Sequence, residues 1–268
     1  MGGLEGCRAK IARAREQFDA LKAQLGPWCQ TQPHEFGHDS NRRTGWHRIR
    51  SMTKSEPPPP DWSVIVGELV HDLRSALDHL VWQLVLANGE TPRETSQFPI
   101  YSYGRLGRAK DRKRRAAQWR DRLYGVDPAD ARFIKALQPY RRRHRLNFVP
   151  LEEVATFSNI DKHRLLLKAA LMAHPDPEIG PFITAIRPAP GALVVETSLS
   201  SPGLVSIDQT VVFQFRVEPP GAKVEVDMND NIPVTVTLGE ASAIPFDNLL
   251  DLIEEVERIV EYFAPRFA

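Results

Sequence analysis

The sequence predicts an α+β protein, in which a helical body carries an antiparallel β insert and is closed by a C-terminal helix. Apolar residues recur at helical spacing through the first part of the chain, and short runs rich in Val, Ile, Phe and Thr fill residues 182–240. An amphipathic stretch then ends the chain. We therefore expect four parts: an N-terminal helix and polar segment (1–56), a helical core (57–174), a β region (182–240) and a C-terminal helix that packs on the body (243–264).

Local signals set the expected elements in order. Gly26-Pro27 is expected to stop a first helix over 4–25. The polar segment 30–56 is either irregular or an extended ribbon, and the four prolines 57–60 form a stiff spacer. Helices are then expected over 62–87, with Asp61 as its cap, and over 105–124, 128–137, 151–172 and 244–263, while strands are expected over 193–197, 211–217 and 234–238.

The composition limits the class of protein. The chain has 268 residues, 42% of them hydrophobic, and balances 35 Lys and Arg against 34 Asp and Glu. These values are typical of a globular protein rather than a disordered chain or a basic nucleic-acid coat. The two cysteines are too few for a disulfide scaffold, and no apolar run predicts a bilayer span or a signal peptide. We expect a cytoplasmic protein that does not engage membranes.

The helix expected over 62–87 has an unusual polar side. One broad arc is apolar. The opposite arc, which we call the polar stripe, carries short polar side chains with no lysine: Glu68, His71, Asp72, Ser75, Asp78 and His79. A solvated face would carry long Lys, Glu and Arg side chains. This pattern favours a functional or buried polar site, although a plain solvated face stays open as the alternative.

Four residues lie between Arg74 and His79 on this helix, and Arg74 is at the edge of the polar side. This spacing resembles the HEPN superfamily, helical bundles whose ribonuclease members carry Arg-x(4–6)-His in one helix and act without metal. The resemblance implies that Arg74 holds the scissile phosphate and that His79 transfers protons, and Asp78 would orient His79. It also implies a homodimer in which two motifs face each other. Ser75 departs from the Asn, Asp or His that often follows the motif arginine.

A wider set of motifs resembles a bacterial protein family without an assigned activity. The matching strings are LRSALDHLVWQL (73–84), FPIY (98–101), LQPY (137–140) and NIDKHR (159–164). They span most of the helical core. This resemblance implies no function.

A second polar cluster lies in the apolar helix expected over 151–172. Asn159 and His163 share one face, and Asp161 points roughly opposite. If this helix packs against the polar stripe of the 62–87 helix, Asn159, Asp161 and His163 would form, with His71, a second wall of the candidate catalytic site. Alternatively, they are core hydrogen bonds that fix the register of the helices.

A basic tract follows the helix expected over 62–87. Residues 105–122 contain nine basic and two acidic side chains, a net charge of +7. Such a helix binds phosphate backbones without sequence specificity, and Trp119, Tyr124 and Tyr140 are available to stack on unpaired bases. The alternative is an exposed helix that pairs with acidic faces of its own fold or of a second copy. The expected nucleic-acid contacts are Arg108, Lys110, Arg112, Lys113, Arg114, Arg115, Arg141, Arg142 and Arg143.

Metal and cofactor sites are not expected. His71, Asp78, His79 and His163 could hold Zn²⁺ or Mn²⁺ only if the two helices packed face to face. No Gly-rich phosphate loop or nucleophile elbow is present in the sequence. We therefore expect an RNA-binding, HEPN-like protein with metal-independent endoribonuclease activity as its candidate chemistry. The alternative is a non-catalytic interaction protein whose His/Asp cluster is structural and which binds an unidentified protein partner.

Overall fold

A computed structural model describes residues 3–31, 36–51, 58–101, 109–142, 149–160, 167–172, 183–199, 204–206, 211–228, 234–238 and 244–268. The protein is mixed α+β, with antiparallel sheets, as the sequence predicts. It forms two compact units. The first comprises residues 1–21, 61–165 and 247–268, and the second comprises residues 22–60 and 166–246.

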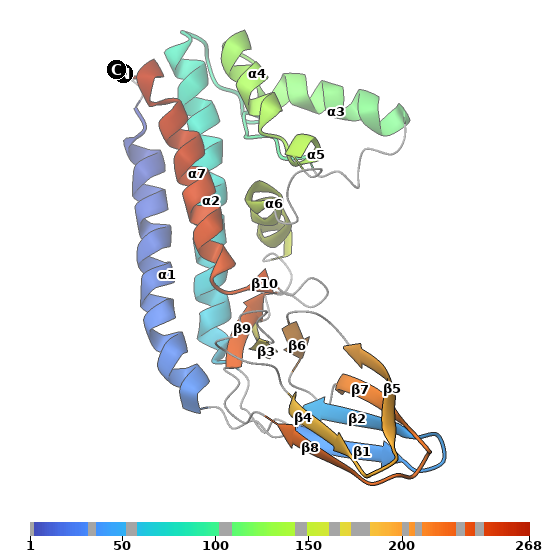
Figure 1. Cartoon of the computed structure of the whole chain (residues 1–268). Coiled ribbons are helices and arrows are strands. Elements are labelled where there is room, and N and C mark those ends of the chain that lie inside the picture. The colour runs from blue at the N-terminus through green and yellow to red at the C-terminus, as the bar shows by residue number, and fades with distance from the viewer. Residues whose placement is uncertain are drawn as a thin grey trace. The chain divides into compact units, whose positions relative to one another are not determined.

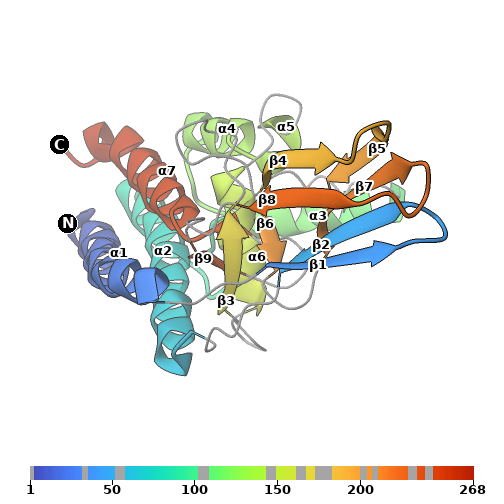
Figure 2. The same cartoon turned by 60° about the horizontal axis from the view of Figure 1, so that its bottom comes forward.

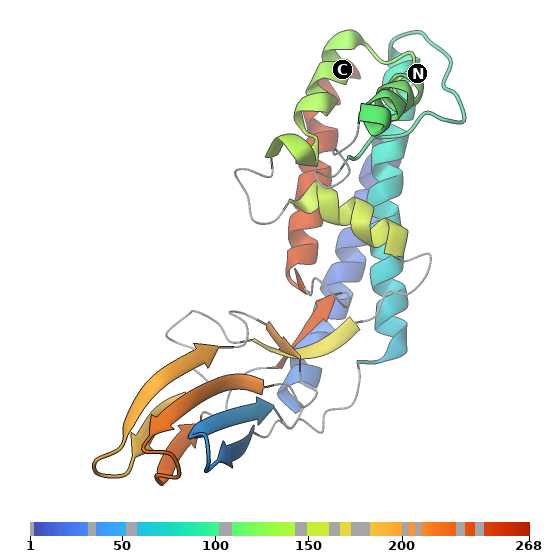
Figure 3. The ribbon, with the colours of Figure 1, turned by 90° about the vertical axis from the view of Figure 1, so that its right-hand side faces the viewer.

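Three long helices form the core of the first unit, to which the first of them contributes only its residues up to Leu21. These are α1 (Glu5–Thr31), α2 (Pro60–Ala87) and α7 (Asn248–Tyr262), which lie side by side (Figures 1 and 3). Helix α7 buries one apolar side, as its periodicity predicts, and thirteen residues of α2 are buried. Apolar burial at helical spacing therefore holds this unit together.

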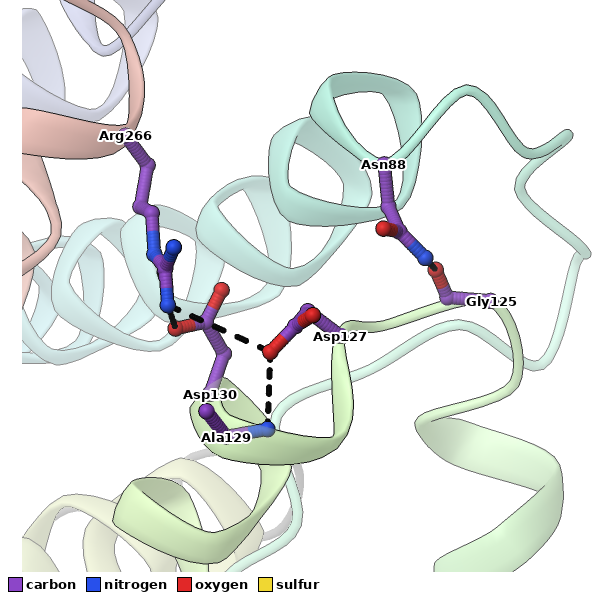
Figure 4. Close-up of polar contacts among 6 residues, drawn as sticks. All are labelled: Asn88, Gly125, Asp127, Ala129, Asp130 and Arg266. Carbon is purple, nitrogen blue, oxygen red and sulfur yellow. Dashed lines mark hydrogen bonds and ion pairs between the residues drawn. The ribbon is translucent and has the colours of Figure 1, made fainter.

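Four shorter helices complete the first unit: α3 (Ala109–Arg122), α4 (Pro128–Ala136), α5 (Pro139–Arg142) and α6 (Pro150–Ile160). Polar contacts fix α4 in place (Figure 4). Asp127 caps the helix by accepting a bond from the Ala129 N–H at 2.7 Å, and Arg266 donates to the buried Asp130 carboxylate at 2.8 Å. The Asn88 amide donates to the Gly125 carbonyl at 3.0 Å, which ties the end of α2 to the segment before α4.

Apart from the end of α1, the described elements of the second unit are β-strands. One sheet has the order β1-β2-β7-β5, from β1 (Phe36–Asn41), β2 (Trp46–Ser51), β7 (Val211–Glu218) and β5 (Leu193–Leu199). A two-stranded ribbon of β4 (Ile183–Pro188) and β8 (Val224–Met228) packs on it through a cluster around Phe215 and Val217 (Figure 2). A second sheet has the order β10-β9-β3-β6, from β10 (Ile244–Pro245), β9 (Val234–Leu238), β3 (Leu167–Met172) and β6 (Leu204–Ser206).

Strands β1 and β2 settle the alternative left open for the polar segment 30–56. They form an antiparallel ribbon, and β2 also pairs with β7. Gly45 makes this possible, since its φ is +72° and a Cβ there would lie 2.3 Å from the Val217 carbonyl oxygen. The β-rich unit thus includes residues that precede the helical core in the sequence.

Four expected boundaries are wrong. The helix expected over 151–172 ends at Ile160, and residues 167–172 are strand β3, because β9 and β6 supply backbone partners that outweigh local helix propensity. Helix α1 continues through Gly26-Pro27 to Thr31, since one proline removes only one helical hydrogen bond. Ile244 and Pro245 belong to a strand, so α7 begins at Asn248. Helix α2 begins at Pro60, where a fixed φ suits the first turn, so Asp61 lies within the helix.

Within the described part of the chain, no helix has both the length and the apolar character needed to cross a membrane.

Candidate nucleic-acid interface

Part of the polar stripe on α2 forms polar contacts with α1. Asp72 is 1% exposed and accepts a bond from Arg13 at 2.5 Å, with Lys10 at 4.0 Å. Glu68 accepts a bond from the Gln17 amide at 3.0 Å. The stripe needs no lysine of its own, because α1 supplies the cations. Asp72 is therefore a buried polar contact between the two helices, whereas Glu68, His71 and His79 are exposed.

Arg74 and Asp78 form a clamp on the loop that follows α2. The Arg74 guanidinium donates to the Asp78 carboxylate at 2.9 Å and to the Phe98 carbonyl at 2.8 Å. Asp78 also accepts the Phe98 N–H at 2.8 Å. Burial lowers the pKa of Arg74 and raises the pKa of Asp78, and the contact between the two groups opposes both shifts. Arg74 thus holds the carbonyl of Phe98, and Asp78 holds its N–H.

His79 lies elsewhere on α2. Its side chain is exposed, and its ring lies beside Gly6 of α1, where an added Cβ would be 3.4 Å from Nδ1. His79 is five positions after Arg74, so the two side chains leave the helix about 140° apart around its axis. The chain by itself therefore brings Arg74 to Asp78 and Phe98, and it does not bring Arg74 to His79.

Two of the residues expected to form a second wall, Asn159 and His71, belong to the described part of the chain, and neither forms a contact that would build such a wall. The Asn159 amide donates to the Ala155 carbonyl of its own helix at 2.6 Å and is exposed. His71 is exposed on α2. Asp161 and His163 lie outside the described residues. Searched over the described residues, the chain has no group of three or more His, Cys, Asp or Glu placed to hold a metal ion.

Gln138 extends the clamp along the loop. It is 0% exposed, and its amide N–H donates to the Pro99 carbonyl at 2.8 Å and to the Ile134 carbonyl at 3.1 Å. Its oxygen accepts the Tyr101 N–H at 3.0 Å. The α2 motif and the FPIY and LQPY strings thus belong to one network, which fixes the backbone from Phe98 to Tyr101.

This network places Tyr101 in a cavity of about 350 Å³ against α3. The Tyr101 and Trp119 rings are 6.3 Å apart at their centroids and inclined by 39°. The cavity is lined by three aromatic rings, three cationic side chains and one alanine: Tyr101, Trp119, Tyr140, Arg115, Arg120, Lys135 and Ala116. Aromatic faces and cations therefore surround one concave surface.

Electrostatics in the cavity favour an anionic ligand. The guanidinium of Arg122 lies 6.0 Å from the Tyr101 ring centroid, and no carboxylate lines the cavity among the described residues. Burial raises the pKa of Tyr101, and the positive charges of Arg122 and Arg115 partly oppose that shift. Within the described structure, the buried Tyr101 hydroxyl has no hydrogen-bond partner.

The other expected nucleic-acid contacts have mixed positions. Lys113 and Arg114 are exposed on α3, and Arg141 lies 5.9 Å from the Tyr140 ring centroid. The residues of this set whose side chains lie outside the described part are Arg108, Lys110, Arg112, Arg142 and Arg143.

Sequence reasoning selected some cavity residues and missed others. It named Trp119, Tyr140 and Arg115 but missed Tyr101 and Lys135. The FPIY and LQPY strings were the available signal, because they contain Tyr101, Gln138 and Tyr140.

Tyr124, expected to stack on bases, is instead covered by a neighbouring cation. The guanidinium of Arg93 lies 3.2 Å from its ring centroid, and Tyr124 does not line the cavity.

In comparisons with known proteins, no family model matches the chain, no curated protein matches its sequence and no solved structure matches its fold. The resemblance to HEPN proteins stays a prediction.

Proposed function

We propose that this chain is an RNA-binding protein that holds single-stranded RNA at the cavity formed by Tyr101, α3 and the end of α4. The observation that carries the proposal is the convergence of Tyr101, Trp119 and Tyr140 with Arg115, Arg120 and Lys135 on one concave surface. Proteins that bind single strands combine these two kinds of side chain, aromatic faces for bases and cations for the backbone.

Each kind of group would have its own task. Unpaired bases would stack on Trp119 or Tyr140, at about 1–3 kcal/mol for each stacked base. Arg120 and Lys135 would contact phosphates, while Lys113 and Arg114, exposed along α3, would extend the track. Each phosphate neutralised on a single strand contributes about −0.7 to the slope of log K against log salt.

The preference for RNA over DNA rests on the resemblance to HEPN ribonucleases, because aromatic rings stack equally well on the bases of RNA and of DNA. That resemblance also supports a homodimer, which light scattering on the purified protein would detect. Strand cleavage belongs to the same resemblance. It would require the Arg74 guanidinium to leave the Phe98 carbonyl and to meet a histidine, from this chain or from a second copy.

Binding affinity measured by fluorescence anisotropy tests the proposal. A labelled twelve-residue oligouridine would be titrated with wild type and with Trp119→Ala, whose ring is only partly buried. Loss of one stacked base predicts about tenfold weaker binding. Tyr124→Ala is the matched control, since it removes an aromatic ring outside the cavity, and it should bind like wild type.

A charge pair on α4 provides the second comparison. Lys135→Gln should weaken binding and reduce the salt slope by about 0.7, whereas Arg132→Gln, exposed on the same helix and outside the cavity, should change neither. Equal losses in Trp119→Ala and Tyr124→Ala would contradict the cavity as the binding site. The same strand of DNA, run in parallel, tests the RNA preference.

Incubation with RNA in EDTA separates binding from cleavage. Cleavage by wild type that is lost in His79→Ala would establish the nuclease. RNA that stays intact while binding to the cavity supports binding alone.

The non-catalytic interaction protein is supported by a separate observation. Arg74 and Asp78, two of the residues that suggested catalysis, hold the Phe98 backbone, so part of that motif has a structural explanation. Under that hypothesis, wild type would bind no RNA in the anisotropy assay, and a partner protein would be its ligand.

A further inference from the structure

The second unit contains a cavity of about 590 Å³ that the proposed RNA site does not use. It is lined by the β1-β2 ribbon, the end of β4 and the turn that leads into β8. Every lining residue belongs to the described part of the second unit. Cavities that hold small molecules have volumes of about 300–1,000 Å³.

Backbone contacts build this cavity. The Val217 N–H donates to the Gly45 carbonyl at 2.9 Å, and the Ala189 N–H donates to the Lys223 carbonyl at 2.9 Å. Gly221, with φ of +83°, brings its turn beside Arg42, whose carbonyl oxygen would lie 3.4 Å from an added Cβ. The walls are therefore fixed by the strand pairing and its turns, before any ligand binds.

Three cations from three elements line the cavity. Arg42 follows β1, Arg187 ends β4 and Lys223 precedes β8. Arg187 is paired with Asp227 at 2.5 Å. Among the described residues, neither Arg42 nor Lys223 has an ion pair. Glu225 is the one carboxylate in the lining, so the lining carries a net charge of +2 with both histidines neutral.

A histidine pair forms part of the same lining. His38 Nε2 and His47 Nδ1 are 2.9 Å apart, and the His47 ring stacks on Phe215 at 4.8 Å between centroids. In a hydrogen bond between two neutral imidazoles one ring donates and the other accepts, so the pair keeps one further N–H that can donate to a ligand.

We infer that this cavity binds a small molecule carrying a phosphate or pyrophosphate group. Arg42 and Lys223 contact the phosphate oxygens, and the remaining N–H of the His38–His47 pair donates to the ligand. The apolar wall of Pro188, Pro190 and Val224 packs against the rest of the molecule. This inference concerns the second unit and does not depend on RNA binding at α3.

Isothermal titration of the full chain with inorganic pyrophosphate, and separately with AMP, tests the inference. Arg42→Gln/Lys223→Gln should weaken pyrophosphate binding at least tenfold. Both side chains are exposed, so the melting temperature should be unchanged. Arg43→Gln is the matched control, because Arg43 is an exposed neighbour of Arg42 in the same turn and does not line the cavity. Lys223→Gln alone should give a smaller loss in the same direction.

Three results would overturn the inference. The first is no binding of either probe to wild type at millimolar concentration. The second is equal weakening by Arg43→Gln, which would indicate a nonspecific effect of surface charge. The third is loss of oligouridine binding in Arg42→Gln/Lys223→Gln as large as in Trp119→Ala, which would assign the cavity to an RNA path.

Discussion

At the scale of single residues, Arg74 has a structural task that its sequence motif does not reveal. It bonds both to Asp78 and to the Phe98 carbonyl, and its side chain is only 18% exposed. His79, its expected catalytic partner, is exposed and lies beside Gly6. The two residues therefore differ in what their removal should do to the folded protein.

Arg74→Ala should lower the free energy of unfolding by about 1.5–3 kcal/mol, because it removes charged hydrogen bonds and leaves the partly buried Asp78 carboxylate without its cationic partner. His79→Ala should change it by less than about 0.5 kcal/mol, as surface substitutions usually do. Urea unfolding of both variants measures the difference. A larger loss in His79→Ala would contradict the clamp.

The histidine pair of the second unit predicts a dependence of stability on pH. Burial lowers the pKa of both His38 and His47, whereas both titrate near 6.5 in the unfolded chain. Below that pH the unfolded state binds more protons than the folded state. The pair therefore makes its full contribution to the free energy of unfolding above about pH 7, and this contribution is lost as the pH falls through 6.5 toward the lower pKa values of the folded state.

Urea midpoints at pH 8 and pH 5.5 check this dependence. Wild type should lose stability over this interval, and the gap between wild type and His38→Gln/His47→Gln should narrow. A gap that widens as the pH falls would show that the folded pair prefers the charged form.

At the scale of elements, α1 is held by ion pairs of two different kinds. Arg13 pairs with Asp72, which is buried, whereas Arg15 pairs with Glu257 at 2.8 Å on an exposed edge of α7. The first pair shields a carboxylate that water cannot reach, and the second competes with solvent and salt.

The two arginines therefore form a matched comparison on one helix. Arg13→Gln should destabilise the protein by about 1–3 kcal/mol, since it leaves the buried Asp72 poorly compensated. Arg15→Gln should cost at most about 1 kcal/mol. Equal effects in thermal or urea unfolding would show that the Asp72 contact is no more important than a surface pair.

The long helices α2 and α7 were predictable from their sequences, and β3 was not. Periodic apolar residues over seven turns identify α2, because only a helix places them on one side. The β3 residues Leu167–Met172 include good helix formers, and their strand state depends on β9 and β6, which lie far along the chain. The site followed the same rule. Trp119 was selected from the basic tract, whereas Tyr101 lies beside it because Gln138 and the Arg74–Asp78 clamp fix the backbone from Phe98 to Tyr101.

At the scale of the whole molecule, the chain combines a helical unit and a β unit, each with its own cationic cavity. The cavity at α3 is rich in aromatic rings, which suits stacked bases, and the cavity in the β unit has histidines and fixed strand walls, which suit a compact phosphate group. The β unit, for which the RNA proposal offers no task, thus acquires one of its own.

Photo-crosslinking of the full chain to a 4-thiouridine oligonucleotide, with the linked peptides mapped by mass spectrometry, tests the RNA-binding proposal most directly. Crosslinks should fall at Tyr101, Trp119 or Tyr140 and should disappear when unlabelled oligouridine competes. Crosslinks confined to residues 183–228, or to the His79 side of α2, would contradict binding at the α3 cavity.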